Sequence, residues 1–155
     1  MINEIYDYQE ANFRFFGLYG AKDGVCGCGD TECKALFKHP VISRWQSVPA
    51  WSDEQVETWD VMGHFNTGFG VLCSGWLVID VDARNGGVAS FEKLCNDVPE
   101  VGQAAFVVAT GSGGGSAHHY FRLPEPMPLR QHLDAYKGID FKASGYVVGA
   151  GSLHA

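Results

Sequence analysis

An apolar run that ends in alternating hydrophobic and polar residues occupies the segment 76–82, which reads Trp-Leu-Val-Ile-Asp-Val-Asp. Successive side chains of a strand point to opposite faces, so Asp80 and Asp82 share one face, while Leu77, Ile79 and Val81 share the other. Two neighbouring carboxylates repel each other, and burying them is costly unless a proton or a cation intervenes. The segment therefore predicts a strand with one core face and one face that can bind a divalent metal. The alternative is a plain strand end that leads into the turn at 85–87.

The hydrophobic pattern also predicts three helices. The first is expected within residues 1–20, where Gly17 and Gly20 end it. Ser52 can cap a second helix, because Gln55 completes a capping box three residues later. A third helix of about ten residues is expected around 89–96. The residues expected to pack along one side of each helix are Ile5, Tyr8, Asn12, Phe15 and Phe16; Val56, Trp59 and Val61 or Met62; and Phe91, Leu94 and Cys95.

Short runs of β-branched and aromatic residues predict further strands. A strand at 70–73 is expected to pair with 76–82 across a turn at 74–75. The other expected strands are 104–110, 117–123, 139–142 and 146–148.

A run of glycine and serine occupies residues 111–116. A dinucleotide-binding fingerprint must open a helix, and the alternating residues after this run predict a strand, so a Rossmann site is excluded. The flanking strands are expected to form a hairpin in which Ser116, His118 and Tyr120 share one face. Glycine amides could then approach an anion beside His118. The alternative is a histidine that is only packed or exposed.

A third carboxylate, Asp140, lies in the strand expected at 139–142. Asp140 and Lys142 point to the face opposite Ile139 and Phe141. Two interpretations are open. Lys142 neutralises Asp140 as an ion pair, or Asp140 binds a metal while Lys142 binds a phosphate.

Three cysteines and a histidine occur in one short segment with the spacing C-x-C-x4-C-x5-H. Four soft ligands at this spacing suit tetrahedral zinc, and a Cys3His set leaves no open position, so a structural zinc is expected. Free thiols with a surface histidine are the alternative. The predicted ligands, within a zinc loop at 26–39, are Cys26, Cys28, Cys33 and His39. Cys73 and Cys95 are expected to be ordinary buried thiols.

Length and composition favour a single folded domain. The chain has 155 residues, and its 46% hydrophobic content fits a globule with its own core. The sequence contains no secretory signal and no run that could span a bilayer, so a cytoplasmic protein without a membrane partner is expected. The formal net charge of -7 argues against a strong stand-alone nucleic-acid binder and predicts weak, salt-sensitive contact with DNA.

Taken in order, these motifs resemble the bifunctional DNA primase/polymerase (prim-pol) domain. That domain belongs to the archaeo-eukaryotic primase superfamily and is common in phages, plasmids and prophages. The matching motifs are Asp80-x-Asp82 with Arg84-Asn85-Gly86-Gly87, the Thr-x-Ser-Gly-Gly stretch leading to His118-x-Tyr120-Phe121, and Ile139-Asp140-x-Lys142 followed by Gly-Tyr-Val-Val and Gly-Ser-x-His. Upstream, the resemblance extends through the cysteines, Lys38-His39-Pro40, Trp45 and Asn66-Thr67-Gly68-Phe69-Gly70-Val71.

The resemblance implies an α/β (α+β) fold, in which helices flank an RRM-like mixed or antiparallel sheet, as one catalytic domain over 1–155. It implies that Asp80, Asp82 and Asp140 are catalytic and hold two divalent metals, Mg²⁺ or Mn²⁺. It implies that the Ser-x-His motif and Lys142 bind the nucleotide. The glycine run is longer than the usual form of that motif, so either Ser112 or Ser116 serves the nucleotide.

The implied activity is template-directed nucleotidyl transfer, with a dNTP or NTP and a DNA template as substrates. The implied partner is a helicase or a primase accessory region, in cis or in trans. Family members normally continue beyond the point where this sequence stops, so we expect either a trimmed piece of a longer replication protein or a small stand-alone one.

Three other functions stay open from the sequence. A binding module of the same fold that performs no synthesis, such as a replication accessory or inhibitor, is favoured by the acidity and small size. A zinc-dependent hydrolase is disfavoured because a Cys3His site is closed to substrate. A rolling-circle nickase would use the stretch 118–120, but its tyrosine adjoins the histidines on one strand and is poorly placed as a separate nucleophile.

Overall fold

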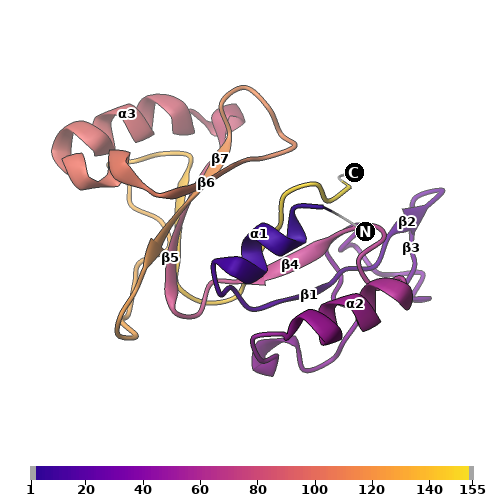
Figure 1. Cartoon of the computed structure of the whole chain (residues 1–155). Coiled ribbons are helices and arrows are strands. Elements are labelled where there is room, and N and C mark those ends of the chain that lie inside the picture. The colour runs from indigo at the N-terminus through magenta and orange to yellow at the C-terminus, as the bar shows by residue number, and fades with distance from the viewer. Residues whose placement is uncertain (1–2, 154–155) are drawn as a thin grey trace. The chain divides into compact units, whose positions relative to one another are not determined.

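The computed structural model describes residues 3–153, which form three α-helices and antiparallel β-sheets. This confirms the mixed α/β class predicted from the sequence. The chain divides into two units, one made of the segments up to Leu72 and from Tyr146 onward, the other of Cys73–Gly145 (Figure 1). The single domain expected over 1–155 stays a prediction. None of the helices described is both long and apolar enough to cross a membrane.

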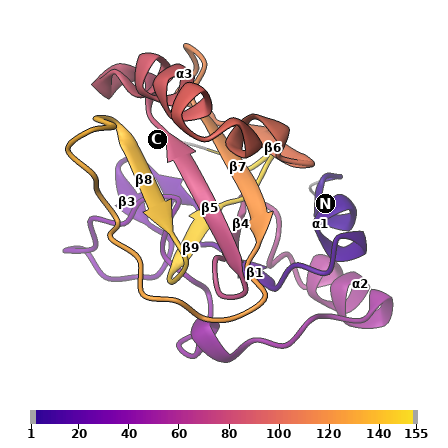
Figure 2. The same ribbon diagram turned by 90° about the vertical axis from the view of Figure 1, so that its left-hand side faces the viewer.

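The unit Cys73–Gly145 contains a four-stranded antiparallel sheet in the order β6-β7-β5-β8. With one helix between its first two strands, this is the RRM-like order expected of a β-α-β-β-α-β unit. The segment 123–138, described throughout, has no helix where such a unit would place its second one. Figure 2 shows the strands side by side, with α3 next to them. The elements are β5 (Trp76–Val81), η2 (Ala83–Asn85), α3 (Gly87–Asp97), η3 (Pro99–Gln103), β6 (Phe106–Ala109), β7 (Ala117–Arg122) and β8 (Ile139–Lys142).

The two faces of β5 differ as the alternation of residues predicts. Ile79 and Val81 pack with Leu94 of α3 in a buried cluster. Phe91 of α3 stacks on His119 of β7, with ring centroids 4.1 Å apart. Other apolar residues of this cluster are Leu77, Val101, Phe121, Tyr136, Ile139 and Phe141. Because α3 covers this face, Asp80 and its neighbours lie on the other one.

The other unit contains a three-stranded sheet, β1-β4-β9, and a two-stranded hairpin, β2-β3. Its core is aromatic: the ring of Phe69 lies 5.1 Å from Tyr8 and 5.9 Å from Phe15, centroid to centroid. The indole of Trp51 donates to the carbonyl of Phe15. The elements are α1 (Ile5–Glu10), β1 (Phe15–Gly17), β2 (Ala21–Lys22), β3 (Val25–Cys26), η1 (Trp45–Ser47), α2 (Asp53–Val61), β4 (Phe69–Leu72) and β9 (Tyr146–Val148).

The capping box predicted for the second helix is present at the start of α2. The Gln55 amide N–H donates to Ser52 Oγ at 3.4 Å, and the Ser52 N–H donates to Gln55 Oε1 at 3.0 Å. Val56 is buried as expected. The expectation that Val61 or Met62 completes the apolar side is wrong, because these residues at the end of the helix are 88% and 66% exposed.

The first helix is shorter than predicted. α1 ends at Glu10, and Asn12 has a φ of 61°, a left-handed conformation that ends a helix. Phe15 and Phe16 lie in β1, where both are fully buried. Burial on both faces of a strand therefore outweighs the helical spacing that the sequence suggests in this segment.

The pairing predicted for the strand at 70–73 is also wrong. The expected turn forms, and the Trp76 N–H donates to the Cys73 carbonyl at 2.8 Å. However, β4 pairs with β1 and β9, while β5 pairs with β7 and β8. Both edges of each strand are occupied by partners distant in sequence, so the short turn does not decide the pairing.

Gly87 opens α3 at a point where backbone segments approach closely. An added Cβ would lie 2.5 Å from the Gly138 carbonyl oxygen and 2.7 Å from that of Asp82. We expect Gly87→Ala to lower the free energy of unfolding by about 2 kcal/mol in urea denaturation, because backbone atoms cannot easily move aside. Gly102→Ala, whose Cβ would meet only Cys95 Sγ at 3.7 Å, is the control and is expected to change stability by less than about 0.5 kcal/mol. Equal stability of Gly87→Ala and the parent would contradict this close approach.

Candidate functional site

Asp80 lies in the middle of a row of polar residues that crosses three strands. It stands directly opposite His118 of β7 and directly opposite Asp140 of β8. Directly paired residues of neighbouring strands share a face, with Cβ atoms about 5 Å apart. The structure therefore brings together three residues that the sequence predicts as site residues.

Asp80 is held between two basic side chains. Lys142 Nζ lies 2.6 Å from Asp80 Oδ2, and His118 Nε2 lies 3.4 Å from Oδ1. Burial opposes ionisation of Asp80, but the hydrogen bonds and charges of His118 and Lys142 outweigh it and hold the pKa of that carboxyl well below its usual range. Lys142 thus pairs with Asp80, and the ion pair with Asp140 considered from the sequence does not form.

Asp140 has partners of its own from the segment that precedes β8. His132 Nδ1 lies 2.7 Å from Asp140 Oδ1, and Gln131 Nε2 donates to Oδ2 at 3.3 Å. The Phe141 N–H donates to the Gln131 carbonyl, which places this segment along β8. Sequence reasoning missed Gln131 and His132, because a proline-rich segment without periodicity gives no local sign of the strand it will lie against.

Asp82 begins a tight turn, residues 82–87, which we call the Asp turn. Asp82 Oδ1 accepts from the Arg84 N–H at 3.0 Å, and Oδ2 accepts from Asn85 Nδ2 at 2.8 Å. The hydrogen bond from the Arg84 side chain is the largest influence on this carboxyl and lowers its pKa. The Gly87 N–H donates to the Asp82 carbonyl at 2.9 Å and closes the turn. Asp82 is therefore an ionised carboxylate whose backbone position is fixed.

The glycine loop, residues 111–115, joins β6 to β7. Its last three glycines have φ values of 66°, 64° and 93°, conformations that glycine adopts without strain. Ser116, directly after the loop, is 3% exposed, and its Oγ accepts from the Ala83 N–H at 3.0 Å. Ser112 is half-buried within the loop. The two serines that the sequence leaves as alternatives thus have different environments.

His118 carries a buried nitrogen with no partner. The residue is 6% exposed, and its Nδ1 has no hydrogen-bond partner among residues 3–153. Buried polar atoms are nearly always hydrogen-bonded. An anion that accepts from a protonated Nδ1 would satisfy this atom, which agrees with the phosphate contact that the family resemblance implies for His118.

The donor atoms around Asp80 suit Mg²⁺ or Mn²⁺, which prefer carboxylate oxygens. As arranged within the described residues, however, Asp80, Asp82 and Asp140 do not form a group close enough to share one ion. Each carboxylate instead accepts from a neighbouring side chain, and Lys142 is the nearest cation to Asp80. A divalent ion that binds Asp80 therefore competes with Lys142.

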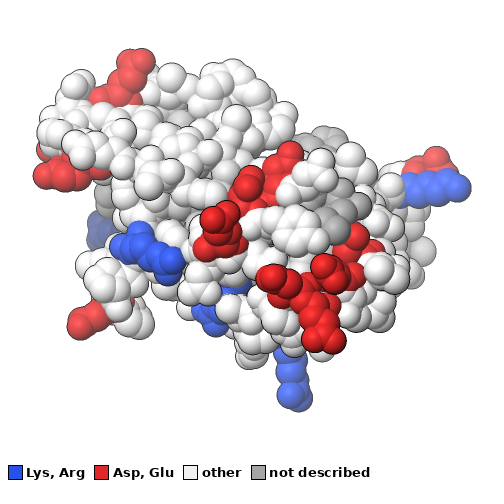
Figure 3. Space-filling view, viewed as in Figure 1, with Lys and Arg blue, Asp and Glu red and all other residues white. Residues whose placement is uncertain are grey.

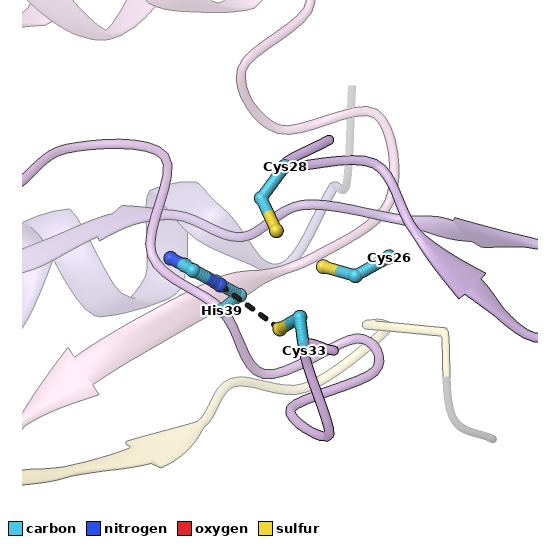
Figure 4. Close-up of side chains that lie close together, drawn as sticks. All are labelled: Cys26, Cys28, Cys33 and His39. Carbon is cyan, nitrogen blue, oxygen red and sulfur yellow. Dashed lines mark hydrogen bonds between the residues drawn. The ribbon is translucent and has the colours of Figure 1, made fainter. Parts of the chain in front are cut away.

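The predicted zinc ligands converge in the other unit. Figure 4 shows the side chains of Cys26, Cys28, Cys33 and His39 pointing toward one another, and their ligand atoms all lie within 4.8 Å of each other. Sulfur atoms around tetrahedral zinc lie about 3.8 Å apart, so a small inward shift suffices. Burial raises the pKa of the Cys26 thiol to about 11, while the backbone hydrogen bond from Asp30 lowers that of Cys28. This Cys3His group can bind zinc.

Contacts outside the zinc loop hold its last residues in place. The Tyr19 N–H donates to the His39 carbonyl at 2.8 Å, and the Tyr19 ring lies edge-on to the His39 imidazole. The hydroxyl of Tyr146 in β9 donates to the Lys38 carbonyl. The zinc loop is thus attached to its own unit by Tyr146 of β9 and by Tyr19, which lies shortly before the loop in sequence.

The two remaining cysteines lie outside the zinc cluster. Cys73 is fully buried, and burial raises the pKa of its thiol to about 12. Cys95 is only half-buried on α3. The prediction of buried thiols is therefore confirmed for Cys73 and only partly met for Cys95.

Acidic side chains gather over α1 and α2 (Figure 3). The residues of these helices include no lysine or arginine, and their acidic members are Asp7, Glu10, Asp53, Glu54, Glu57 and Asp60. Such a surface repels DNA phosphates. It agrees with the weak, salt-sensitive DNA contact expected from the net charge.

The family resemblance is confirmed by comparison with known proteins. The family model described as "Bifunctional DNA primase/polymerase, N-terminal" matches residues 7–155. No curated protein matches the chain.

The Cys3His group generates a prediction about metal content. We expect the purified protein to carry one equivalent of zinc, and Cys33→Ser to lose it and to unfold about 5 °C or more lower, because metal binding is coupled to folding of the loop. Elemental analysis and thermal unfolding measure both effects. Cys95→Ser, which removes a half-buried thiol outside the cluster, is the control. A Cys33→Ser protein with parental zinc content would rule out zinc at this cluster.

The pairing of Lys142 with Asp80 generates a prediction about pH. Because the folded pKa of Asp80 is lower than its ordinary value of 3.8, ionised Asp80 stabilises the fold above that pH, and this stabilisation is lost as the pH falls further. Lys142→Met is expected to lower the free energy of unfolding by about 2 kcal/mol at pH 7 and by less below about pH 4.

Urea unfolding at both pH values measures this difference. Lys137→Met, which removes an exposed lysine of the same unit, is the control and is expected to have little effect at either pH. A Lys142→Met penalty that stays constant with pH would show that the Asp80 pair does not stabilise the fold.

Proposed function

Because the chain belongs to the bifunctional DNA primase/polymerase family, we propose that it catalyses metal-dependent, template-directed nucleotidyl transfer. A dNTP or NTP and a DNA template would be its substrates. Following the resemblance, we propose that it serves replication of a phage, plasmid or prophage. A helicase or primase accessory region, in cis or in trans, would increase the affinity for DNA.

One observation carries this proposal. Asp80, Asp140 and His118 stand in register on one face of β7-β5-β8, and Lys142 contacts the central carboxylate. Carboxylates for metal ions and basic groups for phosphates thus lie within reach of one bound nucleotide. The opposite face is filled by the core under α3, where the one basic side chain of these strands, His119, stacks on the Phe91 ring.

Asp80, Asp82 and Asp140 would hold the divalent ions. When bound, two such ions make the 3′-hydroxyl nucleophilic and neutralise the leaving pyrophosphate. The protein's own part is to keep Asp80 and Asp82 ionised, as the lowered pKa of each supports. Positioning and charge stabilisation, with no covalent intermediate on the protein, are sufficient for this class of reaction.

His118 and Lys142 would bind the triphosphate. The partnerless Nδ1 of His118 would donate to a phosphate oxygen. A divalent ion at Asp80 would release Lys142, whose flexible side chain could then contact the same phosphates. Ser112 and the glycine-loop amides complete the proposed nucleotide site. In the other unit, zinc would stabilise the loop 26–39 and take no part in the chemistry.

A second function is favoured by a separate observation. Every carboxylate of the site already has a partner, and an acidic surface covers α1 and α2. A module that binds nucleotide or another protein without performing synthesis would have these properties. Primer extension separates the two functions.

We expect the protein to extend a short primer on a template at low salt with Mg²⁺ or Mn²⁺, and expect a chelator to stop the reaction. Asp80→Asn and Asp140→Asn should each lower the rate by about 1000-fold, because a neutral amide holds a divalent ion poorly. Asp134→Asn, which changes an exposed carboxylate of the same unit, is the matched control and should extend normally.

Full extension by Asp80→Asn would refute the proposed role of Asp80. A parent protein that binds nucleotide but never extends the primer would instead support the binding module.

A further inference from the structure

Ser116 is buried and hydrogen-bonded within the protein, whereas a nucleotide-binding residue would be open to its ligand. It is 97% buried, and all of its backbone hydrogen-bonding groups are used: its N–H donates to the Gly113 carbonyl, and its carbonyl accepts from the Thr110 N–H. Its Oγ accepts from the Ala83 N–H at 3.0 Å. The side chain therefore faces the Asp turn and holds a backbone group there.

The hydrogen-bonded amide belongs to the residue that follows Asp82. Ala83 is the first residue of η2, and the N–H groups at the start of a helix have no partner within it. Without Ser116, this donor would lose a partner in a part-buried site, which is costly. The Ser116 hydroxyl thus fixes the point where the strand carrying Asp80 passes into the turn carrying Asp82.

The glycine loop also packs directly against the Asp turn and α3. A Cβ on Gly114 would lie 3.4 Å from the Ala83 Cβ, and one on Gly115 would lie 3.1 Å from Val88 Cγ2. The glycine loop, which would bind phosphate, and the Asp turn, which would bind metal, are therefore in contact. The hydrogen bond from the Ala83 N–H to Ser116 Oγ joins the turn to the residue that follows the loop.

We infer that Ser116 is a positioning residue that sets the Asp82 carboxylate for divalent-metal binding, and that Ser112 is the serine that contacts the nucleotide. This inference rests on the proposed function. Ser112 supports its second half, since its side chain is half-buried within the glycine loop and has no hydrogen bond among the described residues. The two serines, which the sequence leaves as alternatives, thus have separate tasks.

The test compares Ser116→Ala with Ser112→Ala in two binding measurements on the full chain. Mn²⁺ binding without nucleotide is followed by electron paramagnetic resonance, and nucleotide binding without divalent ion is followed by NMR. Ser116→Ala should weaken Mn²⁺ binding by about tenfold, as loss of a group that orients a metal ligand does, and should change nucleotide binding by less than about twofold. Ser112→Ala should weaken nucleotide binding and should change Mn²⁺ binding by less than about twofold.

Two further variants exclude a simple folding defect. Ser116→Thr keeps the hydroxyl and should restore Mn²⁺ binding. Ala83→Pro removes the N–H that donates this hydrogen bond. Proline is tolerated there because Ala83 is the first residue of η2 and the preceding residue, Asp82, is extended, with φ −101° and ψ 103°. This variant should weaken Mn²⁺ binding as Ser116→Ala does, and the double variant should be no weaker than either, because both changes break one interaction.

Amide hydrogen exchange reports on the hydrogen bond without any ligand. Exchange at Ala83 should be about tenfold faster in Ser116→Ala than in the parent, and unchanged in Ser112→Ala. If Ser116→Ala weakens nucleotide binding and leaves Mn²⁺ binding intact, Ser116 is a nucleotide ligand and the inference is wrong. If the parent itself binds no Mn²⁺, the proposed metal-dependent function is wrong, and with it the role of Ser116 in metal binding, even if amide exchange at Ala83 changes as expected.

Discussion

The register of β5 against β7 and β8 is the constraint on which the candidate site depends. Asp80 meets both His118 and Asp140 because the three strands pair at one particular alignment. Side chains alternate with a period of two, so a slip by one residue would turn Asp80 into the core under α3 and expose Ile79 in its place. The buried cluster of Ile79, Val81 and Leu94 therefore holds the polar row in place from the opposite face.

Electrostatics on the polar face follow from the same alignment. Asp80 is partly buried, so its charge needs compensation, and Lys142 and His118 provide it at 2.6 Å and 3.4 Å. Asp140 has a separate contact, with His132 Nδ1 at 2.7 Å. A divalent ion at these carboxylates would have to replace these contacts. Such replacement would release Lys142 near the proposed phosphates, which links metal binding to nucleotide binding through one side chain.

Much of this arrangement could be predicted from local sequence, for physical reasons that apply to particular residues. The period of two in 76–82 assigned Asp80 to the face opposite Leu77, Ile79 and Val81, and the Cys3His spacing identified a cluster that the fold assembles. Local sequence failed where distant partners decide. Phe15 and Phe16 have helical spacing but lie in a strand, because their burial depends on elements far along the chain.

The partners of the carboxylates could not be predicted for the same reason. Lys142 is two residues from Asp140, yet it contacts Asp80 across the sheet. His132 lies in an irregular segment whose position along β8 is set by backbone hydrogen bonds. Paramagnetic broadening of backbone NMR signals by Mn²⁺ would test the central claim most directly. We expect the broadening to centre on Asp80, Asp82 and Asp140 and to disappear in Asp80→Asn; broadening centred on the acidic residues of α1 and α2 would contradict a metal site on the β7-β5-β8 face.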